Sequence, residues 1–280
     1  MVDFGILSDA IKRQAVADNI EALTRKPRLL IGPPGVGKTH LVFTLGEQLG
    51  LPVYKFACSE MATGADLIGG NQADPYGRQP LWWVPGPALT AMGYGLANPV
   101  TGVRPPAGIL LIDDMHLAVN ADVMGALMAV LDCGPGGSMM LPTGEMVRAP
   151  GHDEFRVVCT ANGEIDQFPE AIRSRLGGSI LVTEPGREQL RALEPRVLAR
   201  SCYADYQRSS GPTLTYRHWL TLSELWQSLD LATAVMVATD SNAELSKELL
   251  QILAAQGVPE AGELITRLAD SAPSGAPGGY

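Results

Sequence analysis

Short, mostly apolar runs lie at residues 29–31, 109–112 and 155–159, and a glycine or polar residue follows each of them. Runs of this length favour strands, and their nearly continuous apolar character is typical of strands buried on both faces. Such strands belong to parallel sheets, because helices then cover both sides of the sheet. We therefore predict an α/β fold with a parallel sheet flanked by helices.

The first run leads through a glycine-rich loop into a predicted helix. Leu41, Val42, Leu45 and Leu49 recur at helical spacing, and Gly50 is a natural helix stop. The order is therefore strand, loop and helix, which is the context that a phosphate-binding loop requires.

After Thr183 the pattern becomes helical. The stretches at residues 187–200, 217–238 and 243–257 predict a small helical lid. Residues 271–280 are rich in Gly, Pro and Ser, which predicts a disordered tail. The predicted parts are an α/β nucleotide-binding domain over residues 1–184, the lid over residues 185–270 and the tail over residues 271–280.

The loop reads GPPGVGKT and fits the phosphate-loop pattern G-x-x-x-x-G-K-[ST]. Its glycines allow a tight turn that points backbone N–H groups at phosphate oxygens, and the helix that follows adds its positive end. Lys38 is expected to reach the β- and γ-phosphates, and the Thr39 hydroxyl to bind magnesium. The predicted nucleotide-binding residues are Gly32, Pro33, Pro34, Gly35, Val36, Gly37, Lys38, Thr39 and His40.

Two aspartates end the second run, at the edge of the sheet where ligands bind in open α/β folds. We expect Asp113 to hold Mg²⁺ through water, together with Thr39. We expect Asp114 to orient or deprotonate the attacking water. His116 is the nearby rival for that role, but the following loop or helix is expected to turn it away.

Polar residues also follow the third run. Thr160 and Asn162 are expected just past its end, at the level of the γ-phosphate, where an amide could hold water or sense the phosphate. Pro169 suits the first position of a short helix that carries Arg173 and Arg175. These two arginines fit either a solvated face or fingers directed at the nucleotide of a neighbouring subunit.

Composition narrows the class of protein. Apolar residues make up 46% of the 280 residues and charged residues 18%, which is ordinary for a globular protein. The net charge of −9 disfavours a nucleic-acid coat, because such proteins carry a basic face. No apolar run reaches the roughly 18 residues that span a membrane, and the first residues show neither a basic leader nor an h-region. We therefore expect no membrane segment and no secretory signal.

The cysteines and histidines give no support for a metal or disulfide framework. The four histidines are dispersed, and the four cysteines include no CxxC pair. We expect reduced thiols in a cytoplasmic protein. The cysteines are Cys58, Cys133, Cys159 and Cys202.

The order of these motifs resembles an AAA+ ATPase of the MoxR-like group, which includes the CbbQ, NorQ and GvpN relatives. The resemblance covers about residues 3–222. GPPGVGKT is similar to the Walker A motif of the group, and ACSEMATGADLIGG at residues 57–70 to the segment after its second strand. WWVPGPALTAM at residues 82–92 is similar to the start of its helix 2. The resemblance implies two hairpins, a helix-2 insert at residues 71–80 that lines the pore of a ring and another within residues 137–162.

The resemblance also implies roles for single residues. Asn162 corresponds to sensor 1, and Arg217 to sensor 2 in the segment LTYRHWL. PEAIRSRL is similar to the arginine-finger segment, with Arg175 as the expected finger and Arg173 as the second choice. Ile6 is the expected contact of the adenine.

Two residues depart from the pattern of the group. Asp114 replaces the usual glutamate, and Asp-Asp at this place is common in the DnaA and DnaC-like families. The shorter side chain moves the carboxylate by more than about 1 Å if nothing compensates, a displacement that can cost about a hundredfold in rate. Leu176 replaces a phenylalanine after the finger, which is a packing change.

Three functions agree with these features. The first is a homo-oligomeric, hexameric ring that hydrolyses ATP with Mg²⁺ and remodels or activates a client protein, such as one with a von Willebrand A domain. The second is a nucleic-acid loader or initiator of the DnaA/DnaC type, which the helix-2 insert and the acidic charge disfavour. The third is an ATP-gated scaffold with little hydrolysis.

Overall fold

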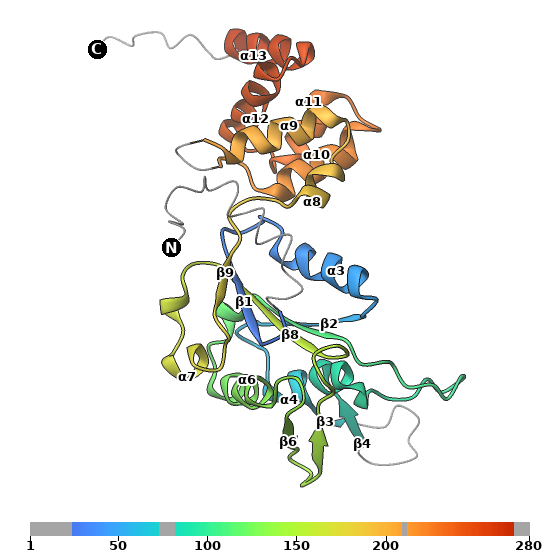
Figure 1. The fold of residues 1–280 in the computed structure, drawn as a ribbon. Helices are drawn as coiled ribbons and strands as arrows, with labels where there is room; N and C mark the ends of the chain where they lie inside the picture. Colours follow the sequence, from blue (N-terminus) through green and yellow to red (C-terminus); the bar gives the residue numbers. More distant parts are fainter. Residues whose placement is uncertain (1–23, 73–81, 209–211, 272–280) are drawn as a thin grey trace, which may run out of the picture. The chain divides into compact units, whose positions relative to one another are not determined.

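The computed structural model describes residues 24–72, 82–208 and 212–271 (Figure 1). They form two compact units, which are described separately. The first unit contains the residues up to Pro33 and from Lys38 to Thr183, and the second contains residues 34–37 and the chain from Glu184 onward. Ile6 and the predicted disordered tail lie outside the described residues.

The first unit is built on one five-stranded sheet in which every pair of neighbouring strands is parallel. The strand order is β2-β5-β8-β1-β9, so the three strands that precede the candidate site residues are direct neighbours. Helices α3 and α6 pack on the sheet, which confirms the predicted fold class (Figure 1). The bounds are β1 Arg28–Ile31, α3 Lys38–Leu49, β2 Val53–Ala57, β5 Ile109–Asp113, α6 Ala121–Cys133, β8 Arg156–Ala161 and β9 Ser179–Leu181.

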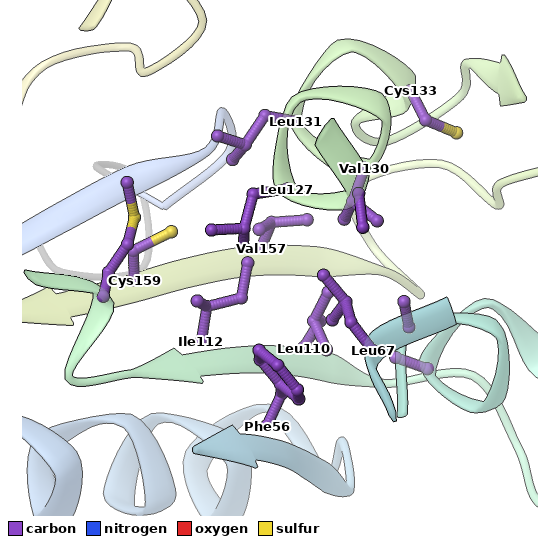
Figure 2. Packing of buried hydrophobic residues seen from close by; sticks show 14 of the residues in the cluster. Phe56, Leu67, Leu110, Ile112, Leu127, Val130, Leu131, Cys133, Val157 and Cys159 are labelled. Atoms are coloured by element: carbon purple, nitrogen blue, oxygen red, sulfur yellow. The ribbon is translucent and has the colours of Figure 1, made fainter. Parts of the chain in front are cut away.

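The central strand β5 is buried on both faces, as its apolar sequence predicts. Leu110 and Ile112 point to one face, where Figure 2 shows them with Val157 of β8 and with Leu127 and Val130 of α6. The alternate residues of β5 belong to the second cluster of the core, which includes apolar residues of α3. The two layers together hold the carboxyl ends of the strands in fixed positions.

Two expected strand ends were wrong by one or two residues. Asp113 is the last residue of β5, and β8 continues through Thr160 to Ala161. The extension of β8 follows from its pairing with β1, where Leu30 lies opposite Thr160 and Ile31 opposite Ala161. Thr160 is therefore a buried strand residue instead of a residue past the end, and Asn162 is the first residue after β8.

The second predicted hairpin is confirmed, whereas most of the predicted helix-2 insert at residues 71–80 lies outside the described residues. Strands β3 (Gly69–Gln72) and β4 (Trp82–Pro85) pair in antiparallel fashion, with residues 73–81 outside the described part. Strands β6 (Ser138–Met140) and β7 (Met146–Arg148) form the second hairpin. The shorter elements around them are α4 Gly64–Ile68, α5 Pro87–Leu89 and η1 Thr90–Tyr94.

The second unit is helical, which confirms the helical pattern after Thr183. Helix α13 extends beyond the three predicted stretches. The helices are α8 Arg187–Arg191, α9 Arg196–Tyr206, α10 Tyr216–Trp226, α11 Leu231–Ala238, α12 Ala243–Ala255 and α13 Pro259–Ser271.

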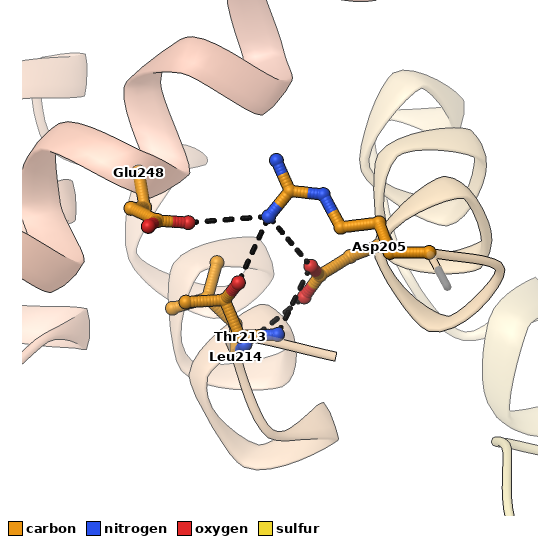
Figure 3. Close-up of polar contacts among 5 residues, drawn as sticks. Asp205, Thr213, Leu214 and Glu248 are labelled. Carbon is orange, nitrogen blue, oxygen red and sulfur yellow. Dashed lines mark hydrogen bonds and ion pairs between the residues drawn. The ribbon is translucent and has the colours of Figure 1, made fainter. Parts of the chain in front are cut away.

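A buried carboxylate organises the second unit (Figure 3). Asp205 accepts hydrogen bonds from the N–H groups of Thr213 and Leu214, at 3.2 and 3.0 Å. Arg208 forms ion pairs with Asp205 at 3.5 Å and with Glu248 at 3.1 Å. Asp205 belongs to α9, Arg208 follows that helix, Glu248 belongs to α12, and Thr213 and Leu214 precede α10, so the contacts join these three helices.

Candidate functional site

The candidate site lies where β1, β5 and β8 end side by side. β5 pairs with β8, and β8 pairs with β1, so the residues after these strands meet at one edge of the sheet. Asp113 and Asn162 come from the ends of β5 and β8, and Lys38 and Thr39 begin helix α3 after the loop that follows β1. Residues that are far apart in the sequence are thereby brought within hydrogen-bond distance.

The Asp113 carboxylate is the best-connected group in the site. Its Oδ1 accepts hydrogen bonds from the hydroxyls of Thr39 at 2.7 Å and Thr160 at 2.5 Å. Its Oδ2 forms an ion pair with the Lys55 ammonium at 2.6 Å. Burial by itself raises the pKa of the Asp113 carboxyl, but the hydrogen bonds from Lys55, Thr160 and Thr39 outweigh burial and hold the pKa below its usual value. Asp113 is therefore an ionised acid at neutral pH.

Thr160 connects the two aspartates. Its buried hydroxyl donates to the Asp113 carboxylate and accepts a hydrogen bond from the backbone N–H of Asp114 at 3.0 Å. A single side chain from β8 thus satisfies groups on both acidic residues. This arrangement fixes where β5 ends and where the chain turns.

Asp114 has an unusual backbone. Its φ of 53° and ψ of 44° place it in the left-handed region, just before the short helix η2 (Met115–Leu117). Aspartate tolerates this conformation better than most residues, and such conformations cluster at functional sites. Asp114 as a whole is only partly buried, in contrast to the buried Asp113 before it.

Lys38 is buried and uses its three N–H donors inside the first unit. It donates to the carbonyls of Gly32 and Pro33, each at 2.9 Å, and to Oδ1 of Asn162 at 2.7 Å. Burial lowers the pKa of the Lys38 ammonium, and the charges of Asp114 and Asp113 oppose that shift. Phosphate oxygens would have to replace some of these acceptors.

His116 is not turned away from the site, contrary to expectation. It lies in η2, and its ring faces Asn162, with Nδ1 3.4 Å from the backbone nitrogen and Nε2 3.4 Å from Nδ2 of that residue. Gln167 fixes the other side of Asn162 by donating to its carbonyl at 2.6 Å. The short η2 helix explains the difference, because it directs the chain back along the end of β8.

The loop between β1 and α3 has the backbone that the motif predicts. Gly35 and Gly37 have φ values of 70° and 97°, which residues other than glycine rarely adopt. Val36 is buried, whereas Pro33, Pro34 and His40 are exposed. The turn is therefore built from local glycine conformations, with one buried apolar residue between the two glycines.

The oxygen ligands of the site suit a magnesium ion that binds together with phosphate groups. Thr39 and Asp113 supply hard oxygen ligands, which Mg²⁺ prefers. Among the described residues, no group of three or more His, Cys, Asp or Glu side chains could hold a metal ion. Mg²⁺ commonly binds to one or two protein ligands plus substrate phosphates, so the residues fit this ion.

Comparison with protein families matches residues 27–176, slightly more than half of the chain, to the AAA domain of the dynein-related subfamily. The chain belongs to this AAA family. The matched region contains the phosphate loop, both aspartates and Asn162.

Individual relatives agree with that assignment. The denitrification regulatory protein NirQ of Stutzerimonas stutzeri is 39% identical over 69 residues, which are 25% of this chain and 24% of NirQ. The protein CbbQ of Hydrogenophilus thermoluteolus is 38% identical over 86 residues, 29% of this chain and 31% of CbbQ. An uncharacterised Staphylococcus epidermidis protein is 32% identical over 171 residues, 58% of each chain. The chain thus covers between about a quarter and somewhat over half of these relatives, and the MoxR-like resemblance is confirmed.

The two candidate finger arginines, Arg173 and Arg175, both form ion pairs within the first unit. Arg173 ends the short helix α7 (Glu170–Arg173) and pairs with Asp166 at 2.9 Å. Arg175 pairs with Asp132 at 2.7 Å, and its Nη1 donates to the carbonyl of Ala171 at 2.6 Å. Each guanidinium is thus held beside a partly exposed carboxylate.

The remaining predicted site residues fall in other parts of the chain. Arg217 is the second residue of α10, in the second unit, and the structure does not place it relative to the first unit. Ile6 belongs to the residues that are not described. Lys55, in contrast, lies in the site although no motif includes it. The signal that could have located it is the register of β2 and β5, in which Lys55 precedes Ala57, the partner of Asp113, by two residues.

We predict that Thr160→Val lowers the free energy of unfolding by about 1–3 kcal/mol, because the variant removes the buried hydrogen bond to Asp113 and leaves the partly buried Asp114 N–H without this partner. Thermal unfolding measures the effect. Thr160→Ser retains the hydroxyl and is the matched control, so it should remain closer to wild type. Equal unfolding midpoints for the two variants would contradict the bridging role of the hydroxyl.

Proposed function

We propose that the chain is a Mg²⁺-dependent ATPase that works as a homo-oligomeric AAA+ ring. The observation that carries this proposal is the convergence of Lys38, Thr39, Asp113, Asp114 and Asn162 at the ends of three adjacent strands. The family supports the proposal, since AAA domains are generally ATPases. Nucleotide binding and water activation need different chemical groups, and both kinds of group are present.

In the binding step, the loop N–H groups and the Lys38 ammonium bind the phosphates of ATP. The γ-phosphate competes with Asn162 and the loop carbonyls for the three Lys38 donors. The Thr39 hydroxyl and the Asp113 carboxylate hold the Mg²⁺ that accompanies the nucleotide. Ile6 is the proposed contact of the adenine.

In the hydrolytic step, Asp114 orients a water molecule and accepts its proton. The left-handed backbone at Asp114 offers a way to compensate for the shorter side chain, because the turn redirects the Cα–Cβ bond. Asn162 lies between Lys38 and His116, where its amide group can respond to the γ-phosphate.

The complete site needs a second subunit. We assign Arg175 as the finger that reaches the nucleotide of the neighbouring subunit, with Arg173 as the alternative, and Arg217 as the sensor 2 residue. The finger would exchange its carboxylate partner, Asp132 in the case of Arg175, for phosphate oxygens across the interface. A hexamer is the proposed ring size.

The proposed client is a protein, with a von Willebrand A domain as one suitable kind. The two hairpins support contact with a polypeptide, and the second of them exposes Met140 and Met146, which lie opposite each other at its end. A net charge of −9 disfavours nucleic acid as the binding partner.

We expect Lys38→Ala to weaken binding of Mg²⁺-ATP by about a hundredfold or more, because a charge-assisted contact to the phosphates is lost. Binding of a fluorescent ATP analogue measures the affinity. Lys26→Ala, which changes an exposed lysine before β1, should bind like wild type. Near-normal affinity of Lys38→Ala would overturn the assignment of the phosphate loop.

We expect Arg175→Ala to retain ATP affinity and to lose about a thousandfold in turnover, because a finger stabilises the transition state of the adjacent site. Mixtures with Lys38→Ala subunits should recover part of the activity, since intact fingers would then face intact nucleotide sites. Phosphate release from the mixtures is the measurement.

Arg173→Ala is the matched control for this experiment and should retain most activity. An inactive Arg173→Ala variant together with an active Arg175→Ala variant would reverse the assignment of the finger.

A further inference from the structure

Lys55 places its ammonium group beside the Asp113 carboxylate, which faces the proposed magnesium site. It lies in β2, which pairs with β5, and its Nζ is 2.6 Å from Oδ2 of Asp113. The Lys55 side chain is 42% exposed, whereas that of Asp113 is 7% exposed. A buried carboxylate therefore depends on an ammonium group that reaches it from the solvent side.

The Asp113 carboxylate has limited room for further partners. Two hydroxyls, from Thr39 and Thr160, already donate to Oδ1, and Oδ2 is occupied by the Lys55 ammonium. An ionised carboxylate offers about four acceptor positions. A magnesium ion, or water bound to it, must share this carboxylate with Lys55, and two cations at such a short distance repel each other.

We propose that Lys55 competes with Mg²⁺ for Asp113 and so sets the Mg²⁺ concentration at which nucleotide binds. The inference rests on the proposed function, in which Asp113 faces the metal. Lys55 neutralises the buried carboxylate until Mg²⁺-nucleotide takes its place. The ammonium then moves to solvent while Asp113 keeps a positive partner throughout.

The physical properties of lysine suit this exchange. A buried carboxylate without a cation is costly, so an empty site without Lys55 would be destabilised. Lysine is a single point charge on a flexible stem, and its partial exposure gives the ammonium a short path into water. Lys38 does not take over this role, because its three donors are directed to Gly32, Pro33 and Asn162.

The first test is a Mg²⁺ titration of nucleotide binding, read by a fluorescent ADP analogue. We expect Lys55→Met to lower the half-saturating Mg²⁺ concentration by roughly threefold to tenfold, because the competitor is removed and the volume is retained. Lys55→Arg retains the charge and should stay near wild type. An unchanged or increased half-saturating concentration in Lys55→Met overturns the proposal.

The second test is thermal unfolding, a measurement that does not depend on ATP turnover. Lys55→Met should have a lower unfolding midpoint than wild type in nucleotide-free buffer, and the gap should narrow with saturating Mg²⁺-ADP. In an Asp113→Asn background, Lys55→Met should have little effect, since the charge that it serves is gone. An equal effect of Lys55→Met in both backgrounds overturns the proposal.

These outcomes are separable from a failure of the proposed function. If wild type binds nucleotide without any dependence on Mg²⁺, the proposed function fails. If wild-type binding depends on Mg²⁺ and Lys55→Met leaves that dependence unchanged, only the role of Lys55 fails.

Discussion

The Asp113 carboxylate is buried at the carboxyl end of β5, and three side chains from other elements hold it in place. Thr39 reaches it from α3, Lys55 from β2 and Thr160 from β8. A buried charge must be paired and hydrogen-bonded, so these contacts are a requirement of the fold as well as a property of the site. The parallel order of β2, β5, β8 and β1 is what brings the partners to one point.

The same network positions the residues proposed for water activation. The Thr160 hydroxyl accepts a hydrogen bond from the backbone N–H of Asp114, and that hydrogen bond supports the left-handed turn after β5. Lys38 connects the loop carbonyls to Asn162, whose other side faces His116. A change at Lys38 can therefore alter groups at the ends of two neighbouring strands through direct contacts.

Local patterns in the sequence were sufficient for the fold and for the phosphate loop. The apolar run before Asp113 predicts a buried strand, and the glycines before Lys38 predict a tight turn, because both depend on neighbouring residues alone. The role of Thr160 was missed because strand pairing with β1 extends β8 by two residues. Lys55 was missed for a similar reason, since its contact with Asp113 depends on the register of strands far apart in sequence. His116 was misjudged because the direction of η2 is not encoded in any motif.

We propose that Asp114 makes the site at the end of β5 a hydrolytic one. The most direct measurement is steady-state phosphate release by wild type and by Asp114→Asn, at ATP concentrations that saturate both proteins and in the same oligomeric state. We expect continuous phosphate release by wild type and almost complete loss of release in Asp114→Asn, with ATP affinity retained. Equal turnover by the two proteins would contradict this proposal, because a residue other than Asp114 would then activate the water.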